Sequence, residues 1–316
     1  MTRAARAEAR SGRRAGFVAI IGRPNAGKST LLNRFAGQKI AIVSPKPQTT
    51  RNRIQGIVTR AEGQIVFVDT PGLHQAESVL GRQMMREVTA ALEGIDMLLA
   101  VVDASAAGTA EDEALLQKVR SHRGPVLLAL NKVDRMAKEK LLPLMDAYGK
   151  QFDYAAMVPI SALAGDGCDR LLAEIFRLLP EGEGYFPEDA VTDQPERFLA
   201  GEIVREKAIH FTRDEVPHAL AVVVEKYEEG PRLLRIYATI QVERGSQKKI
   251  VIGGKGAMLK KIGTAARKEL EEILGSKVFL ELYVKVAPRW RENPGEVGRL
   301  DWHKQLEDLT GGEYEE

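Results

Sequence analysis

The chain has 316 residues, 44% of them hydrophobic, which is enough for sizeable cores and favours two domains. The formal net charge is only +2, so the overall charge balance indicates no particular partner. The single cysteine, Cys168, excludes a disulfide within the chain and is typical of a reducing compartment. Apolar runs such as 97–102 are far shorter than the roughly 20 residues of a membrane-spanning helix.

The N-terminal extension, residues 1–15, is basic and is expected to be disordered. Residues 1–14 hold five arginines against one acidic residue, Glu8, and no apolar segment of the secretory type. An organellar transit peptide and an additional RNA contact stay open as alternatives.

A phosphate-binding loop follows the first predicted strand. The apolar run 17–21 predicts a buried strand, residues 28–36 predict a helix, and the pattern G-x-x-x-x-G-K-S between them is that of nucleoside triphosphatases. Backbone amides and the helix N-terminus would face the phosphates, Lys28 would reach the β- and γ-phosphates, and the Ser29 hydroxyl would bind Mg²⁺. The residues predicted to contact the nucleotide here are Gly22, Arg23, Pro24, Asn25, Ala26, Gly27, Lys28, Ser29 and Thr30.

Strands and helices are predicted to alternate as far as residue 179. The further strands are 54–59, 64–69, 96–103, 125–130 and 156–160, and the further helices are 79–93, 109–121, 136–149 and 168–179. This alternation indicates an α/β fold with a mostly parallel sheet and helices on both faces, whose ligands bind at the carboxyl ends of the strands.

The motif Asp69-Thr70-Pro71-Gly72 comes at the end of the strand 64–69. An aspartate in this place can hold the Mg²⁺ shell, usually through water, and Gly72 can offer its N–H to a γ-phosphate and move when that phosphate leaves. In isolation the motif would predict an ordinary turn, but its position after the phosphate-binding loop favours a nucleotide site.

The motif Asn131-Lys132-Val133-Asp134 follows the strand 125–130 and indicates guanine. The Asp134 carboxylate can accept hydrogen bonds from guanine N1–H and N2–H₂ together, whereas adenine would leave it unpaired. The Lys132 stem can lie over the ring, and Asn131 can tie this loop to the phosphate-binding loop. After the strand 156–160, the base can be supported by the backbone of Ser161, Ala162 and Leu163.

The ordered set GRPNAGKST, DTPG, NKVD and SAL resembles the translation-factor-related GTPases. The segment 45–53, PKPQTTRNR, resembles the first switch of the Era family in particular, and it is polar and broken by prolines, as a switch should be. The resemblance implies that Thr50 closes on Mg²⁺ and the γ-phosphate, with Thr49 as the alternative. A solvated loop would describe the GDP state equally well.

Three positions bear on hydrolysis. Leu73 stands where Ras-like GTPases have a glutamine, and because leucine cannot orient a water molecule we expect slow unaided hydrolysis. The next residue, His74, is more typical of a solvated side chain than of a catalytic one. Asn25 can ligate K⁺ beside the phosphates in place of an arginine finger, as in relatives with this asparagine, or it can only brace the loop. The expected catalytic residues are Lys28, Thr50, Gly72 and Asn25.

A second, smaller α+β domain follows a stretch rich in glycine, proline and acidic residues. A helix is predicted at 196–210, strands at 218–227, 233–243 and 277–286, and the tryptophans near the C-terminus, Trp290 and Trp302, are expected to pack on this domain. The predicted organisation is an extension at 1–15, a GTPase domain at 16–180, a linker at 181–195 and an RNA-binding domain with a tail at 196–316.

Gly253-x-x-Gly256 lies between an apolar run and a predicted helix and has the form of the KH-domain clamp, which grips about four nucleotides. From Arg244 to Lys268 there are eight Lys or Arg residues and no Asp or Glu, a patch that attracts phosphates. A solvated helix face is the alternative. The residues predicted to bind RNA are Lys248, Lys249, Gly253, Gly254, Lys255, Gly256, Lys260 and Lys261.

The order helix, strand, strand, helix, strand resembles a type II KH domain, and both domains in this order resemble the Era GTPases over nearly all of 16–302. The resemblance implies a monomeric GTP-hydrolysing switch that uses GTP/GDP and Mg²⁺. It also implies binding to the 3′ end of 16S rRNA, a role in small (30S) ribosomal subunit assembly, and a cytoplasmic location with peripheral association with the inner face of the membrane.

Two other functions stay open at this point. The chain could be an RNA-binding scaffold whose nucleotide is structural, which multiple-turnover phosphate release would distinguish from a switch. It could also be a GTPase of tRNA modification, because such proteins share the phosphate-loop asparagine. Those proteins end in a cysteine or carry a folate-type domain, whereas this chain ends Glu-Tyr-Glu-Glu and has a KH-like domain.

Overall fold

The computed structural model describes residues 12–72 and 78–302. These residues form two compact units, and each is described by itself. The first unit holds the described residues up to 41 together with 53–72 and 85–193, and the second holds 42–52, 78–84 and those from 194 onwards. Of the predicted disordered extension at 1–15, residues 1–11 lie outside the described part of the chain, and the prediction is wrong for Arg14 and Ala15, which begin the first strand.

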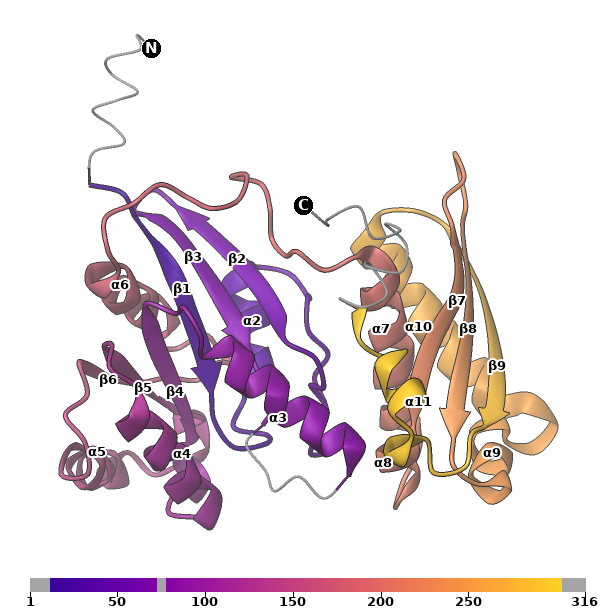
Figure 1. Cartoon of the computed structure of the whole chain (residues 1–316), viewed down its shortest axis with the longest axis horizontal. Coiled ribbons are helices and arrows are strands. Elements are labelled where there is room, and N and C mark those ends of the chain that lie inside the picture. The colour runs from indigo at the N-terminus through magenta and orange to yellow at the C-terminus, as the bar shows by residue number, and fades with distance from the viewer. Residues whose placement is uncertain (1–11, 73–77, 303–316) are drawn as a thin grey trace, which may run out of the picture. The chain divides into compact units, whose positions relative to one another are not determined.

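A six-stranded sheet forms the centre of the first unit (Figure 1). Its strand order is β2-β3-β1-β4-β5-β6, and every neighbouring pair is parallel except β2 and β3. The mostly parallel sheet predicted from the alternation is therefore confirmed. The strands are β1 (Arg14–Ile21), β2 (Ile54–Arg60), β3 (Gly63–Asp69), β4 (Met97–Asp103), β5 (Val126–Asn131) and β6 (Ala156–Pro159).

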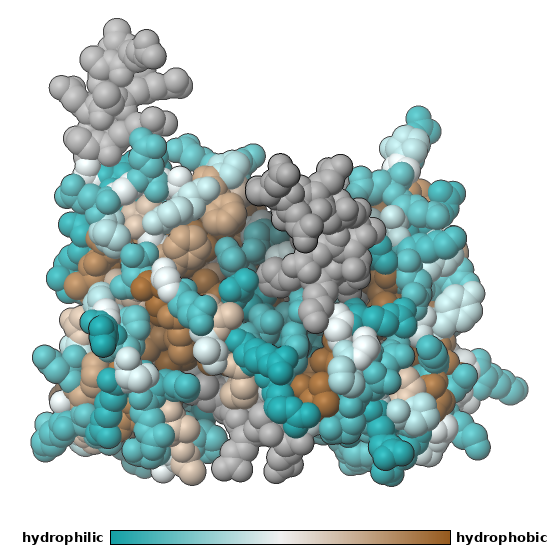
Figure 2. All heavy atoms as spheres, viewed as in Figure 1, coloured by the Kyte–Doolittle hydropathy of each residue, from teal (hydrophilic) through white to brown (hydrophobic). Residues whose placement is uncertain are grey.

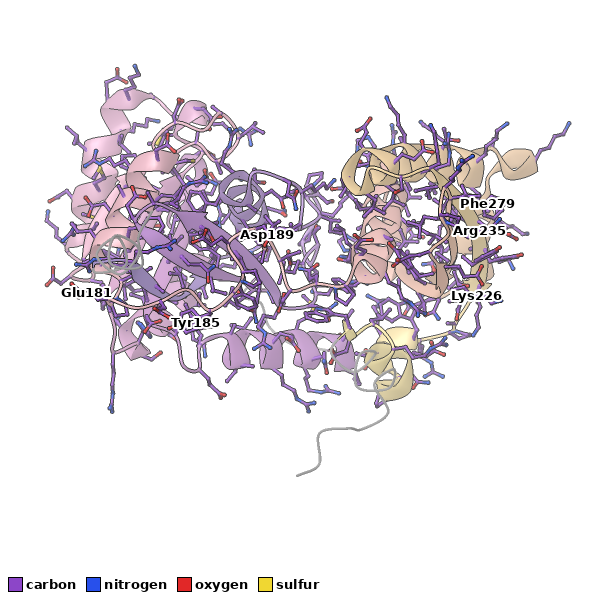
Figure 3. All side chains as sticks on the ribbon, turned by 90° about the horizontal axis from the view of Figure 1, so that it is seen from above. Glu181, Tyr185, Asp189, Lys226, Arg235 and Phe279 are labelled. Carbon is purple, nitrogen blue, oxygen red and sulfur yellow. The ribbon has the colours of Figure 1, made fainter. Side chains whose placement is uncertain are left out.

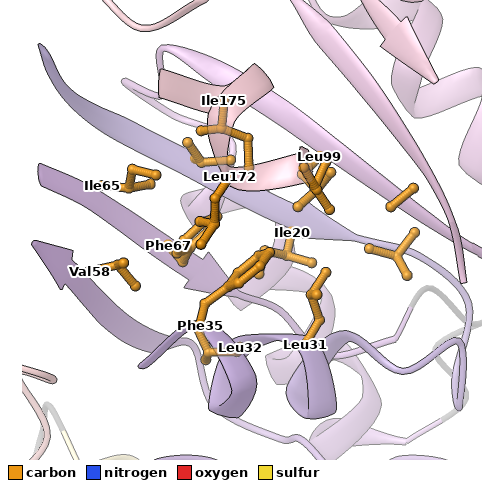
Figure 4. Close-up of a cluster of buried hydrophobic side chains, with 14 of the residues drawn as sticks. Ile20, Leu31, Leu32, Phe35, Val58, Ile65, Phe67, Leu99, Leu172 and Ile175 are labelled. Carbon is orange, nitrogen blue, oxygen red and sulfur yellow. The ribbon is translucent and has the colours of Figure 1, made fainter. Parts of the chain in front are cut away.

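Helices cover both faces of this sheet because successive strand residues point to opposite sides. Val18 and Ile20 of β1 pack with α2 (Lys28–Ala36) and α6 (Cys168–Leu178). Within this core the rings of Phe35 and Phe67 stack with centroids 5.0 Å apart (Figure 4). On the opposite face, Ala19 and Ile21 join a second core built on the other helices, α3 (Val79–Ala91), α4 (Ala110–Ser121) and α5 (Leu141–Gly149).

The start of α5 differs from the prediction. The helix begins at Leu141 rather than at residue 136, and a 3₁₀ turn occupies Lys138–Lys140. Pro143 explains the difference, because proline fits the first turn of a helix but would remove a hydrogen bond from the interior of a helix that started at 136.

The segment predicted as a linker is fixed to the first unit as far as Asp193. The N–H of Ile57 in β2 donates to the Val191 carbonyl (2.8 Å), and Gly56 forms an isolated bridge with Thr192. We call residues 181–193 the strap; Figure 3 labels Glu181, Tyr185 and Asp189 on it. The strap pairs with the outer edge of β2, which would otherwise offer unpaired backbone groups to another chain.

A buried glutamine holds the middle of the strap. Gln64 Oε1 accepts hydrogen bonds from the N–H groups of Tyr185 (2.7 Å) and Phe186 (2.9 Å), and its Nε2 donates to the Phe186 carbonyl (2.9 Å). The Tyr185 ring also packs on Phe17, with centroids 4.7 Å apart.

The second unit has a three-stranded sheet in the order β7-β8-β9, in which β7 and β8 are antiparallel and β8 and β9 are parallel. Helices α7 and α10 cover one face of this sheet, and their apolar residues form one core with β8 (Figure 1). The elements are α7 (Glu196–Phe211), α8 (Val216–Ala219), β7 (Ala221–Glu228), β8 (Leu234–Val242), α9 (Gly245–Ile252), α10 (Ala257–Leu274), β9 (Val278–Val286) and α11 (Pro294–Gly298).

The other face of this sheet carries polar and aromatic side chains, among them Lys226, Arg235 and Phe279 (Figure 3). The two tryptophans near the C-terminus are buried, as predicted, and Trp290 Nε1 donates to the Ala219 carbonyl (2.9 Å).

Three helices of the second unit, α8, α9 and α11, were not predicted. Residues 216–219, partly assigned to a strand, form α8, in which Pro217 occupies the first turn where its missing N–H costs nothing. The apolar run before Gly253 belongs to α9, an eight-residue helix that is too short to be stable alone. The order is therefore helix, helix, strand, strand, helix, helix, strand, helix, and the Gly-x-x-Gly stretch joins two helices.

Over residues 12–72 and 78–302, no helix is both long and apolar enough to cross a membrane. Hydrophilic and hydrophobic residues are interspersed on the face shown in Figure 2.

Replacing Gln64 by alanine should loosen the strap. The N–H groups of Tyr185 and Phe186 would lose their acceptor, so we expect the free energy of unfolding to fall by roughly 1–3 kcal/mol. Cleavage at strap glutamates such as Glu183 by a glutamate-specific protease should become faster. Thr192→Val removes one hydrogen bond to the Gln55 carbonyl and should have a smaller effect. An unchanged cleavage rate in Gln64→Ala would contradict the anchoring role.

Candidate functional site

The phosphate-binding loop joins β1 to α2 at the carboxyl edge of the sheet. A side chain would not fit at Gly22 or Gly27 of this loop, because both lie against neighbouring atoms. Gly27 has a φ of +100°, and a Cβ there would lie 2.2 Å from Asn131 Nδ2. A Cβ on Gly22 would lie 2.3 Å from the Val101 carbonyl oxygen. The loop therefore has the tight backbone curl that lets its amides point at one anion.

Lys28 is buried inside this curl. Its Nζ donates to the carbonyls of Gly22 (3.0 Å) and Arg23 (3.1 Å). Burial lowers the pKa of Lys28 to about 8, although the nearby Asp69 opposes this shift. The ammonium is thus held at the centre of the loop, where an anionic phosphate would favour its charged form.

Asp69 ends β3 and is fully buried next to the loop. Its Oδ2 accepts a hydrogen bond from Ser29 Oγ (2.7 Å), while its Oδ1 has no hydrogen-bond partner among the residues that the structure describes. Burial raises the pKa of Asp69 to about 6, against the opposing effects of Lys28 and Ser29. A buried carboxylate oxygen without a partner is the kind of group that a cation satisfies.

The donor set fits Mg²⁺. The Ser29 hydroxyl and the Asp69 carboxylate are hard oxygen ligands, which this cation prefers. The described part of the chain holds no group of three or more His, Cys, Asp or Glu residues that could hold a metal. A magnesium ion at Ser29 would therefore take most of its ligands from phosphates and water, as Mg²⁺ commonly does.

The Asp-Thr-Pro-Gly stretch lies against the phosphate-binding loop. Thr70 Oγ1 donates to the Ile20 carbonyl (2.9 Å), which fixes the end of β3 to β1. A Cβ on Gly72 would lie 2.8 Å from the backbone of Pro24, so only glycine allows this approach. Leu73 and His74, which were considered for hydrolysis, lie outside the described residues.

Asn131, at the end of β5, connects the base-recognition loop with two other loops. Its Nδ2 donates to the Ala26 carbonyl (2.7 Å) and its Oδ1 accepts from the Ala162 N–H (2.9 Å). One buried side chain therefore joins the phosphate-binding loop, the Asn-Lys-x-Asp motif and the Ser-Ala-Leu motif.

Lys132 and Asp134 follow Asn131 in the base-recognition loop. Lys132 has a left-handed backbone, with a φ of 65°, and its Nζ donates to the Asn25 carbonyl (2.6 Å) and to Asp103 Oδ2 (2.7 Å). Asp134 lies exposed in the 3₁₀ turn Val133–Arg135. In the Ser-Ala-Leu motif, Ser161 and Ala162 are buried and Leu163 is exposed. The Asp134 carboxylate is thus accessible to a ligand.

The structure does not bring every predicted residue into this group. Thr50 belongs to the second unit, where it is buried, and its closure on Mg²⁺ stays a prediction. Conversely, the sequence analysis missed Asp103, which ends β4 and contacts Lys132. Its position at the carboxyl end of a predicted strand was the one available signal.

The predicted RNA clamp is a turn between α9 and α10. Gly253 has a φ of +73°, and a Cβ there would lie 2.7 Å from the Met258 Cβ, whereas Gly254 has open space around it. Lys255 and Gly256 also have a positive φ. The turn is therefore fixed from inside by Gly253 and presents Gly254 and Lys255 to solvent.

The predicted basic residues surround this turn on both helices. Lys249, Lys255, Lys260 and Lys261 are exposed and Lys248 is half-buried. Lys261 Nζ lies 4.3 Å from the centroid of the Phe211 ring, a cation–π contact. Together with the N-terminus of the 18-residue helix α10, these lysines can attract a phosphate backbone.

Comparison with protein families matches both units. Residues 17–132 match a family described as 50S ribosome-binding GTPase, and residues 215–291 match the KH domain. The GTPase Era of Geotalea daltonii is 52% identical over 279 residues, which are 88% of this chain and 94% of that protein. The GTPase Era of Ruminiclostridium cellulolyticum is 48% identical over 290 residues, which are 92% of this chain and 97% of that protein.

Two solved structures resemble the whole chain. One is a single-site variant of Aquifex aeolicus Era bound to GDP and AlF₄⁻, with 45% identity, a TM-score of 0.88, and coverage of 91% of this chain and 98% of that one. The other is Era in complex with MgGDPNP and nucleotides 1506–1542 of 16S ribosomal RNA, with the same identity, TM-score and coverage.

Replacing Asp134 by asparagine should change the preferred base. The variant loses a charged acceptor for guanine N1–H and N2–H₂, so GTP binding should weaken by roughly 2–5 kcal/mol. Xanthosine triphosphate, whose 2-oxo group suits an amide donor, should bind better to it. The measurement is a competition titration of both nucleotides. The matched control is Glu139→Gln, an exposed acid in the next turn, which should leave both affinities as they are. Unchanged GTP preference in the Asp134 variant would reject the assignment.

Proposed function

Because the chain belongs to the Era family of GTPases, we propose that it is a GTP-driven switch that binds the 3′ end of 16S rRNA and acts in small (30S) ribosomal subunit assembly. The enzyme hydrolyses GTP to GDP and phosphate. The observation that carries the proposal is the combination, in one chain, of the phosphate-binding loop around Lys28 with a Gly253-x-x-Gly256 turn between two helices.

The proposed domain boundaries follow the two functions. We assign nucleotide binding to residues 16–180 and RNA binding to residues 196–316, with residues 181–195 between them. The family matches at 17–132 and 215–291 lie inside these limits, which supports the division.

In the proposed nucleotide site, GTP or GDP and Mg²⁺ are the ligands, as in the similar Era complexes. The loop amides and Lys28 would hold the phosphates, and Ser29, Thr50 and Asp69 would hold Mg²⁺. The guanine base would be recognised by Asn131, Lys132 and Asp134, with support from the backbone of Ser161, Ala162 and Leu163.

Hydrolysis in this site depends on stabilising charge at the γ-phosphate. The Lys28 ammonium, the loop amides and the Gly72 N–H would act on the non-bridging oxygens, where charge is held in the transition state. Mg²⁺, when bound, adds positive charge at the β- and γ-oxygens. With Leu73 in place of a glutamine, no side chain at that position orients the water, so we expect slow turnover without an activator.

Potassium is proposed as a further source of charge. Asn25 lies in the phosphate-binding loop with a left-handed backbone, and its carbonyl accepts from Lys132 Nζ (2.6 Å). Because the backbone is held in this way, the side-chain oxygen of Asn25 can serve a cation beside the phosphates.

Three further properties rest on the family resemblance alone. We propose a monomer, a cytoplasmic location, and peripheral association with the inner face of the membrane. The two alternative functions are less well supported, because the relatives reported above are Era GTPases and the second unit carries a KH domain.

The RNA proposal is tested by a double change in the clamp, Gly254→Asp with Lys255→Asp. Open space around Gly254 means that a Cβ there meets no protein atom, while two added negative charges and one lost positive charge repel phosphates. We expect RNA affinity to fall at least tenfold and GTP hydrolysis to persist. The measurement is a competition titration of a 16S 3′-end oligonucleotide against a scrambled one at fixed salt.

A control with the same charge change is available in the second unit. Ser276→Asp with Lys277→Asp alters an exposed turn between α10 and β9 and should leave RNA affinity near that of wild type. Equal competition by both oligonucleotides, together with wild-type binding by the clamp variant, would refute the KH assignment and favour a solvated or membrane-facing patch.

The potassium proposal predicts a difference between salts. Hydrolysis should run faster in KCl than in NaCl of equal ionic strength, because only K⁺ would fit the site beside the phosphates. Asn25→Ala should abolish this difference while leaving GDP affinity nearly unchanged. Steady-state phosphate release in the two salts provides the measurement, and equal rates for the wild type would leave Asn25 as a brace of the loop.

A further inference from the structure

We propose that Asp103 is a positioning residue for guanine nucleotides, because one buried carboxylate holds the Lys132 side chain and lies beside Arg23 of the phosphate-binding loop. The inference rests on the nucleotide site proposed above. Asp103 is the last residue of β4, and the strand register places it alongside Asn131, the first residue of the base-recognition motif. The parallel pairing of β4 with β5 therefore brings the carboxylate to the base loop.

Both oxygens of this carboxylate are engaged. Oδ2 accepts from Lys132 Nζ at 2.7 Å and lies 3.5 Å from Arg23 Nη2. Oδ1 accepts from the N–H (3.1 Å) and the hydroxyl (2.6 Å) of Ser105. Ser105 thus fixes the rotamer of Asp103, and Asp103 in turn fixes the end of Lys132.

The position of Lys132 gives this contact its function. A lysine side chain is flexible, and ordering it when a ligand arrives would weaken binding. Here the ammonium is bound by Asp103 and the Asn25 carbonyl, so the aliphatic stem crosses from the base loop to the phosphate-binding loop and is fixed at both ends. An ordered stem of this kind offers an apolar surface to the face of a base.

The Asp103 carboxylate keeps its negative charge although it is buried. Burial favours a higher pKa for Asp103, but the hydrogen bonds from Lys132 and Ser105, together with the positive charge of Lys132, outweigh burial. The pKa is therefore lowered, and the carboxylate is ionised at neutral pH. Arg23 is held independently, since its Nη2 donates to the Ala106 carbonyl (2.8 Å) and its Nε lies 3.7 Å from Asp112. Loss of the Asp103 charge would therefore act mainly on Lys132.

Asp103 also caps the 3₁₀ turn Ala104–Ala106, so the test must distinguish its effect on nucleotide binding from this structural role. Asp103→Asn keeps an acceptor for Ser105 but removes the charge that holds Lys132. Lys132→Met keeps the apolar stem and removes the ammonium. We expect each variant to bind a fluorescent GDP analogue about 10- to 30-fold more weakly than wild type. The double variant should bind no more than threefold more weakly than the weaker single variant, because both changes break one contact.

Two measurements distinguish the positioning of Lys132 from a folding defect and from recognition of the guanine edge by Asp134. Since the stem supports the base equally in the ground state and the transition state, Asp103→Asn should raise KM for GTP and leave kcat within twofold. The ratio of GTP to ITP affinity should also stay constant, because ITP lacks only the 2-amino group that Asp134 would bind. Ser105→Ala, the matched control, removes the hydroxyl bond but keeps the backbone N–H that donates to Asp103 Oδ1, so the carboxylate stays oriented and GDP affinity should change by less than twofold.

The outcomes distinguish this inference from the proposed function. If wild type binds GDP and Asp103→Asn or Lys132→Met binds it within twofold of wild type, Asp103 has no positioning role and the proposed function stands. A double variant whose loss equals the product of the single losses also overturns the inference. If wild type itself does not bind GDP, the proposed nucleotide site is wrong. Lys132 is partly exposed, so Lys132→Met tests the pair even if Asp103→Asn does not fold.

Discussion

The nucleotide site depends on one buried amide. Asn131 donates to the Ala26 carbonyl and accepts from the Ala162 N–H, so three loops that are far apart in the sequence share a single side chain. Leaving either partner unsatisfied in this buried place would cost about 1–3 kcal/mol. Gly27 serves the same contact, because any Cβ there would collide with the Asn131 amide. The three loops thus form one connected surface.

Much of this site could be predicted from the sequence, because a parallel sheet gathers the carboxyl ends of its strands at one edge. The strands that end at Ile21, Asp69 and Asn131 each lead into a motif. The same rule points to the end of the strand 96–103, but Asp103 belongs to no motif, and its contact with Lys132 follows from the register of β4 against β5. Helix α9 was missed for a related reason: eight residues are too few for a clear pattern, and tertiary contacts stabilise the helix.

The two adjacent glycines of the predicted RNA clamp, Gly253 and Gly254, lie in different surroundings. In the structure, Gly253 is needed for the protein itself, because a Cβ would overlap Met258, while the space around Gly254 is open. Two glycines of one motif are thus present for different physical reasons, and the spacing of the motif does not distinguish them.

The strap has a consequence for how the first unit can be separated from the rest of the chain. Residues 191 and 192 pair with the outer edge of β2, so a fragment that stops at residue 180 would leave this edge without its partner. An unpaired strand edge is a template for self-association. The smallest fragment in which the β2 edge keeps its partner therefore extends through the strap to Asp193, well past the last turn of α6.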